Sequence, residues 1–245
     1  MTIALLASCL AQAFRPGLTE SIRKLGSSLG LDLVVPKAQT CCGLTAWDAG
    51  QLGAARAAAR RTLQVFASYD SVVTPSPACL RMVQEHIPAL LDGQPEAAEA
   101  QELAARSTTW LNFLVNFDGI GQLRLTYDGP IALFTPCTDA DGDGVRRLLT
   151  SVSGVSLISM TRQWCCGWGN NLAWRHPHVS EAMAGPIITD LVMGRARLAL
   201  TTDIGCLLHL EPLLVSAGGP RILHVAEFLA LVAEAPLVTE ALTSS

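Results

Sequence analysis

The sequence contains few charged and few aromatic residues, and it has no long apolar run. Only 16% of the 245 residues are charged, and the formal net charge is −4. Because binding to phosphates needs a basic face, this charge argues against nucleic acid as the main partner. No apolar run approaches the roughly 20 residues that a membrane-spanning helix needs. We therefore expect no nucleic-acid partner and no membrane span.

Sequence motifs for nucleotide binding and for export are also missing. Neither a Gly-x-Gly-x-x-Gly turn after a strand nor a P-loop is present, so flavin or nicotinamide chemistry must reside on another chain. The eight residues before Cys9 contain no Lys or Arg and are too few for a secretory signal. We therefore expect a cytoplasmic protein. In that reducing compartment, clustered cysteines more often bind metal than form disulfides.

The eight cysteines are the most informative residues, because they form one pattern that occurs twice in the sequence. In each half a lone cysteine is followed by an adjacent pair with a glycine after it, and then by another lone cysteine. Equivalent cysteines lie 128, 124, 124 and 127 residues apart. A fixed period of this kind indicates a duplicated structural unit. The first set is Cys9, Cys41, Cys42 and Cys79, and the second is Cys137, Cys165, Cys166 and Cys206.

Each cysteine motif follows a short apolar segment that is typical of a buried strand. In the first half these segments are residues 2–7, 31–35 and 71–74, and helical patterns lie between them. Alternating strands and helices predict an α/β fold with duplicated parallel-sheet units. Because ligands of such sheets gather at the C-terminal ends of the strands, each unit should bring its cysteines together there.

The period and the composition together predict two domains with a linker between them. Half of the residues are apolar, which is enough for a sizeable core. The segment after residue 92 is rich in Ala, Glu and Gln, and a turn signal precedes the second set of strands. We place the first domain at residues 1–92, a helical linker at 93–129 and the second domain at 130–245.

Four thiolates in this pattern favour iron–sulfur clusters or zinc, since both select soft sulfur ligands. Adjacent side chains diverge, so Cys41 and Cys42 cannot easily chelate one small ion, but they can serve two irons of one cluster. The glycine after each pair allows a positive φ, and a backbone N–H in such a loop can donate to sulfur. We expect all eight cysteines to bind the iron of [4Fe–4S] clusters or of a non-cubane variant, with zinc as the alternative at one site.

Other uses of the cysteines stay open on the residues alone. Disulfides would require strained bridges between neighbours and a less reducing compartment, and purely apolar cysteines would not repeat in register. Catalytic thiols without metal are a further alternative. Trp164 and Trp168 flank the second pair and could shield it from water, and His209 is either a donor near the site or a solvated residue.

The motifs resemble the CCG-domain family of iron–sulfur proteins, and the resemblance covers nearly the whole chain. The family includes the iron–sulfur subunits of glycolate oxidase and of bacterial L-lactate oxidation, and a cysteine-rich component of heterodisulfide reductase. The resemblance implies an iron–sulfur electron-transfer subunit of a 2-hydroxy-acid oxidising complex, rather than a complete enzyme. Its partners would be a ferredoxin-like iron–sulfur protein or a flavin subunit, which could hold it at the inner membrane. The matching segments are residues 38–43, 75–79, 165–169, 203–206 and 224–227.

The chain departs from the family pattern after Cys137 (Thr138-Asp139), after the second cysteine pair (Asn170-Asn171), and at the final Cys-x-x-Cys element. Ser76 and Asp203 replace the first of those cysteines in the two halves. Four thiolates per half suit a [4Fe–4S] cubane or a zinc ion, and Asp203 is a candidate fifth, oxygen ligand.

The alternative functions are a scaffold subunit that binds zinc and a thiol–disulfide redox subunit similar to that of heterodisulfide reductase.

Overall fold

Two parallel four-stranded sheets with the same topology form the framework of the molecule. The computed structural model describes residues 1–138, 142–158, 160 and 164–234. The strand orders are β2-β1-β3-β4 and β6-β5-β7-β8, so the second order repeats the first when β5 is aligned with β1. The predicted α/β fold with duplicated parallel sheets is confirmed. The first sheet consists of β1 (Ile3–Leu5), β2 (Leu33–Val34), β3 (Ser71–Thr74) and β4 (Ser107–Thr109), and the second of β5 (Thr126–Phe134), β6 (Ser153–Ile158), β7 (Leu198–Thr201) and β8 (Arg221–His224).

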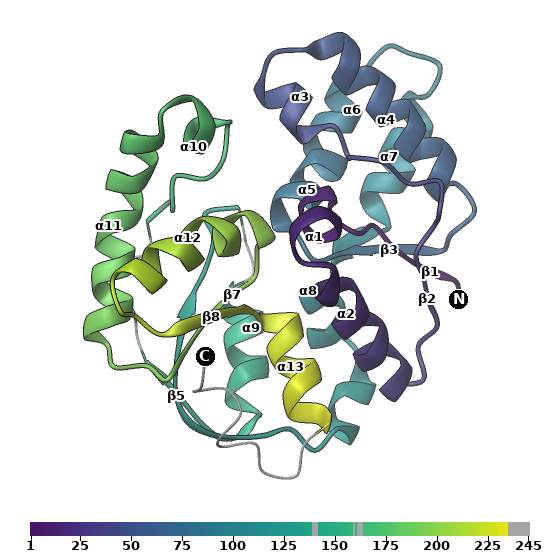
Figure 1. The fold of residues 1–245 in the computed structure, drawn as a ribbon. Helices are drawn as coiled ribbons and strands as arrows, with labels where there is room; N and C mark the ends of the chain where they lie inside the picture. The colour runs from purple at the N-terminus through teal and green to yellow at the C-terminus, as the bar shows by residue number, and fades with distance from the viewer. Residues whose placement is uncertain (139–141, 159, 161–163, 235–245) are drawn as a thin grey trace.

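Helices connect the strands in both halves, as Figure 1 shows. Those of the first half are α1 (Cys9–Phe14), α2 (Pro16–Ser28), α3 (Leu44–Asp48), α4 (Leu52–Phe66), α5 (Pro77–Arg81), the π-helical turn η1 (Met82–His86), α6 (Ile87–Leu90), α7 (Ala97–Ala105) and α8 (Trp110–Val115). A 3₁₀ turn, η2 (Asp118–Gln122), leads to the second half, which contains α9 (Gly142–Thr150), α10 (Leu172–Arg175), α11 (Pro177–Met193), α12 (Ile204–Ser216) and α13 (Val225–Glu234). In the described part of the chain, no helix has the length and apolarity needed to cross a membrane.

The segment between the two sets of cysteines contains a strand as well as helices. The segment 93–129, predicted as a helical linker, contains α7 and α8 but also β4, which pairs with β3 in the first sheet. Asp48 is the last residue of α3, and Gly50 with φ 72° separates α3 from α4.

Alternation along β1 divides the first half between two cores. Ile3 and Leu5 point into one apolar cluster, while Ala4 lies in another, as expected for side chains that alternate across a sheet. The first cluster continues into the second half, where α2 packs against α13 (Figure 1). Leu18 of α2 and Phe228 of α13 are both fully buried in it. The two halves therefore share this first cluster, whereas the cluster that contains Ala4 lies entirely in the first half.

Buried polar contacts also join the halves. The Arg15 side chain donates to Glu227 at 2.9 Å and to Glu211 at 2.8 Å. The Nε2 atom of His224 lies 2.9 Å from the Pro75 carbonyl oxygen of the first half and 2.8 Å from the Thr202 carbonyl oxygen of the second. Both neighbours accept hydrogen bonds, so Nε2 carries the proton. Burial lowers the pKa of His224, which keeps the ring neutral in this position.

The ion pair between the halves generates a prediction about stability. Replacing Arg15 with Ala should lower the free energy of unfolding by about 2 kcal/mol, because it leaves the mostly buried Glu227 carboxylate without its cation. Arg23→Ala is the matched control, since it removes an exposed pair with Glu20 that is worth under about 0.5 kcal/mol. Denaturant unfolding of both variants measures the difference, and equal losses would contradict the structural role given to Arg15.

Candidate metal centres

The parallel sheets deliver each set of cysteines to one edge, at the C-terminal ends of the strands. In the first half, Cys9 follows β1, the adjacent pair follows β2, and Cys79 lies five residues after the end of β3. In the second half the same three strand ends, of β5, β6 and β7, precede the equivalent cysteines. Cys9 is also the first residue of α1, and Cys206 lies in the first turn of α12.

The structure brings the four cysteines of the first set together. The Sγ atoms of Cys9 and Cys41 are 3.7 Å apart. Cys42 lies within hydrogen-bonding reach of both Cys41 and Cys79, so the four thiols form one continuous group. All four line a single cavity of about 110 Å³.

The second set forms an equivalent group. The Sγ atoms of Cys166 and Cys206 are 3.0 Å apart and buried. Cys165 lies within hydrogen-bonding reach of Cys137 and of Cys166. Each group therefore has two buried thiols near the core and two thiols that are partly or fully exposed. All eight cysteines are free thiols, and none is paired in a disulfide.

The glycine of each Cys-Cys-Gly motif has the conformation expected of it. Gly43 and Gly167 have φ values of 97° and 87°, in the left-handed region. The turn directs the Gly43 N–H toward Cys41 Sγ at 3.5 Å and the Gly167 N–H toward Cys165 Sγ at 3.4 Å. Backbone donors to sulfur of this kind stabilise negative charge on the sulfur.

Hydrogen bonding makes the thiols of each group unequal in acidity. Donation from Cys42 and Cys9 lowers the pKa of Cys41, and donation from Cys137 and Cys166 lowers the pKa of Cys165. The hydrogen bond that Cys9 gives to Cys41 raises the pKa of Cys9. The first proton lost from each group therefore comes from the first cysteine of the adjacent pair.

Each donor set consists of four thiols, the soft ligands that both iron–sulfur clusters and zinc select. Four thiols from three loops, with backbone N–H groups aimed at sulfur, are the ligands that iron–sulfur clusters use. Among the described residues, no group of three or more His, Cys, Asp or Glu side chains is arranged so that it could hold a metal ion. The sulfurs are spaced as thiols hydrogen-bonded to each other. They must move apart to accept metal, and the exposed thiols of each group can do so most easily.

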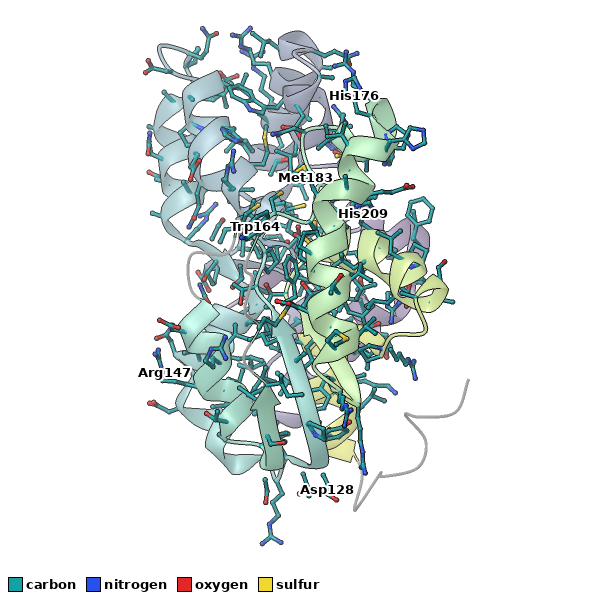
Figure 2. All side chains as sticks on the ribbon, turned by 90° about the vertical axis from the view of Figure 1, so that its left-hand side faces the viewer. Asp128, Arg147, Trp164, His176, Met183 and His209 are labelled. Atoms are coloured by element: carbon teal, nitrogen blue, oxygen red, sulfur yellow. The ribbon has the colours of Figure 1, made fainter. Side chains whose placement is uncertain are left out.

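Three residues near the second pair differ in their surroundings. Trp164 is 60% exposed and lines a surface pocket together with Cys165. Trp168 packs over Gly205 and lines the cavity of the first site. The Nε2 atom of His209 lies 2.9 Å from Ser180 Oγ, and His209 lies near enough to Cys165 to contribute to the lowered pKa of that thiol. Figure 2, which looks onto α11, shows Trp164, Met183 and His209 around the upper half of this helix.

Sequence reasoning missed two features of the sites. Ser180, on the buried face of α11, donates to the Gly167 carbonyl oxygen at 2.9 Å and so holds the second cysteine loop. Asn170 and Asn171 follow the second pair, but they line the cavity of the first site together with Trp174. The only sequence signal for a role of Ser180 is a hydroxyl within an otherwise apolar helix face. Nothing in the sequence indicates that residues 170–174 contact the first half.

The acidity differences generate a prediction about thiol reactivity in metal-free, reduced protein. Between pH 8 and pH 6, alkylation of Cys41 and Cys165 should fall little, because a lowered pKa keeps these sulfurs as thiolates. Alkylation of Cys9 and Cys137, whose pKa values are raised, should fall about 100-fold over the same interval. Mass spectrometry after brief iodoacetamide treatment measures each site. Faster labelling of the two more exposed thiols at pH 6 would show that the hydrogen-bonding pattern is wrong.

Comparison with known proteins agrees with this organisation. The cysteine-rich domain model CCG matches residues 3–84 and again residues 131–211. The chain is 32% identical to lactate utilization protein A of Geobacillus kaustophilus, over 94% of this chain and 98% of that protein. It is 31% identical to lactate utilization protein A of Geobacillus thermodenitrificans over the same shares of both chains.

The fold also has a counterpart among solved structures. The crystal structure of a hypothetical protein from Helicobacter pylori superimposes with a TM-score of 0.65 at 12% identity. The match covers 96% of this chain and 49% of the other, so the chain spans about half the length of that protein. At this identity the likeness shows the fold alone. The repeated domain match and the full-length similarity place the chain in the family of cysteine-rich CCG-domain proteins, as a distant homologue of lactate utilization protein A.

Proposed function

We propose that the chain is an iron–sulfur electron-transfer subunit of a complex that oxidises a 2-hydroxy acid of the L-lactate type. The observation that carries this proposal is the pair of four-thiol groups at equivalent sheet edges, in a homologue of lactate utilization protein A. In the first site Cys9, Cys41, Cys42 and Cys79 would hold one cluster. In the second, Cys137, Cys165, Cys166 and Cys206 would hold the other.

The arrangement of each group suits electron transfer. When bound, an iron–sulfur cluster supplies one-electron redox chemistry at a potential that its surroundings set. The buried thiols of each site lie against the core, where a low dielectric strengthens the effect of nearby charges and dipoles. The exposed Cys9 and Cys137 lie at the surface, where a redox partner can approach. The backbone N–H groups of Gly43 and Gly167 would stabilise the reduced, more negative state.

Oxidation of the hydroxy acid itself would take place on a partner chain. The sequence holds no dinucleotide fingerprint and no P-loop, so it offers no site for a flavin or nicotinamide. We therefore assign the chain to a cytoplasmic complex with a ferredoxin-like iron–sulfur subunit or a flavin subunit. We also keep residues 1–92, 93–129 and 130–245 as the domain boundaries, with β4 of the middle segment completing the first sheet.

Metal analysis tests the proposed function directly. Protein purified without oxygen should contain about eight iron and eight sulfide per chain if both sites hold cubanes. Reduction with dithionite should give an EPR signal. One or two zinc ions without sulfide would instead support the scaffold function. Reduction of a heterodisulfide by the isolated chain would support the thiol–disulfide function.

Single cysteine substitutions should separate the two sites. Cys42→Ser removes a buried thiol from the first group only, and Cys166→Ser removes the equivalent thiol from the second. Each variant should retain about half of the iron and sulfide, because the other four thiols remain in place. The two variants control for each other, since they make the same chemical change in opposite halves. Full metal content in both variants would contradict the assignment of these cysteines as ligands.

A further inference from the structure

Two of the positions at which the chain departs from the family pattern, Ser76 and Asp203, contact each other across the junction of the halves. Ser76 lies three residues before Cys79, and Asp203 lies three residues before Cys206. The Ser76 hydroxyl donates a 2.7 Å hydrogen bond to Asp203 Oδ2, although 127 residues separate them in the chain. Both side chains are buried, with exposed fractions of 2% and 4%.

Each of the two side chains also holds the backbone of a candidate ligand. Ser76 caps α5, and its Oγ accepts a hydrogen bond from the Cys79 N–H at 3.3 Å. Asp203 caps α12, and its Oδ1 accepts from the Cys206 N–H at 3.3 Å. A continuous path of three hydrogen bonds therefore runs from Cys79 through Ser76 and Asp203 to Cys206.

The Asp203 side chain acts in this path as a hydrogen-bond acceptor. Besides Ser76, its two oxygens accept from the N–H groups of Gly205 at 2.8 Å and Ala78 at 3.5 Å. Together with the Cys206 N–H, these donors occupy both oxygens of the Asp203 side chain. The structure thus gives Asp203 a role other than that of a fifth ligand.

The carboxylate stands between the two candidate metal centres. It lines the cavity that contains Cys9 and Cys41, although it belongs to the helix that carries Cys206. In buried surroundings a charge acts strongly on its neighbours, and hydrogen bonds in a chain polarise one another. The Arg15 contacts also cross the junction without touching Ser76 or Asp203, whereas His224 bonds to the carbonyl oxygens of Pro75 and Thr202, the residues that precede them.

We propose that the buried Ser76–Asp203 hydrogen bond couples the two cysteine sites, so that the charge state of one alters the redox equilibrium of the other. The pair acts through the two cysteine-bearing helices and binds no metal itself. This inference rests on the proposed function, because it concerns two clusters in one chain. Coupling of this kind must be reciprocal, since both sites share one free energy of interaction.

The coupling can be measured by removing one site and observing the other. Iron and sulfide are reconstituted without oxygen into the wild type and Cys166→Ser, and the first site is titrated by EPR. Loss of the second site should shift the reduction equilibrium of the first site about tenfold, which is about 59 mV for one electron. In a Ser76→Ala background the same comparison should give less than about a twofold shift, because the 2.7 Å bond is lost and only the 3.5 Å bond from the Ala78 N–H to Asp203 remains. An unchanged shift in that background, or no shift with Ser76 present, would overturn the proposal.

Control variants separate coupling from folding. Ser76→Thr retains a hydroxyl and should retain the coupling, while Arg15→Ala weakens the junction without touching the bridge and should also retain it. If the wild type binds no iron and sulfide, the proposed function fails. If it loads both sites and Ser76→Ala leaves the coupling intact, only the present inference fails.

Removing the charge gives a second test that preserves the shape of the bridge. Asp203→Asn can still bond to Ser76, because the hydroxyl can reverse its direction. It should raise the reduction potential of both sites, measured separately in the Cys166→Ser and Cys42→Ser backgrounds. Asp48→Asn is the matched control, because Asp48 lines only the first cavity and should affect the first site alone. A shift confined to the second site in Asp203→Asn would contradict a shared role.

Discussion

A left-handed turn that only glycine can make holds each pair of adjacent cysteines in place. A Cβ atom added to Gly43 would lie 3.0 Å from the Ala58 side chain, and one added to Gly167 would lie 2.8 Å from the Ser180 carbonyl oxygen. The Cys-Cys-Gly backbone thus packs directly on α4 in one half and on α11 in the other. Because this contact fixes where the paired sulfurs point, the lone cysteines can reach them only from neighbouring strand ends. The parallel sheet provides those ends.

The same turn lies in different surroundings in the two halves. Near Gly43 the closest groups are Ala58, the Ala55 carbonyl and the Met82 methyl group, so the loop rests on a mainly apolar face. At the positions equivalent in the repeat, the second half has Ser180 bonded to the loop and His209 in place of Met82. Hydrogen bonds and polarity around a cluster tune its potential. The two repeats therefore have the same backbone turn at the site, but different side chains surround it.

The repeat made much of this structure predictable, because short-range patterns determine it. Apolar segments before each cysteine motif indicated the strands, and the rule for parallel sheets brought the cysteines to one edge. The individual side-chain contacts between the two repeats could not be predicted. Asp203 is a potential ligand by sequence because it replaces a cysteine, and only its distance to Ser76 shows that both oxygens are occupied. His209 was expected near the second site for the right reason, its spacing from Cys206, but its partner Ser180 comes from another helix.

The first site is completed by the second half of the chain. The cavity around Cys9 and Cys41 is closed by Trp168, Trp174 and Asp203, all of which belong to the second repeat. The hydrophobic core that joins α2 to α13 holds these residues against the first sheet. A separated first half would lose this cover and expose the face of α2 that now lies in the shared core. The two repeats therefore pack around a shared cluster, and the environment of the first candidate metal centre depends on the sequence of the second repeat.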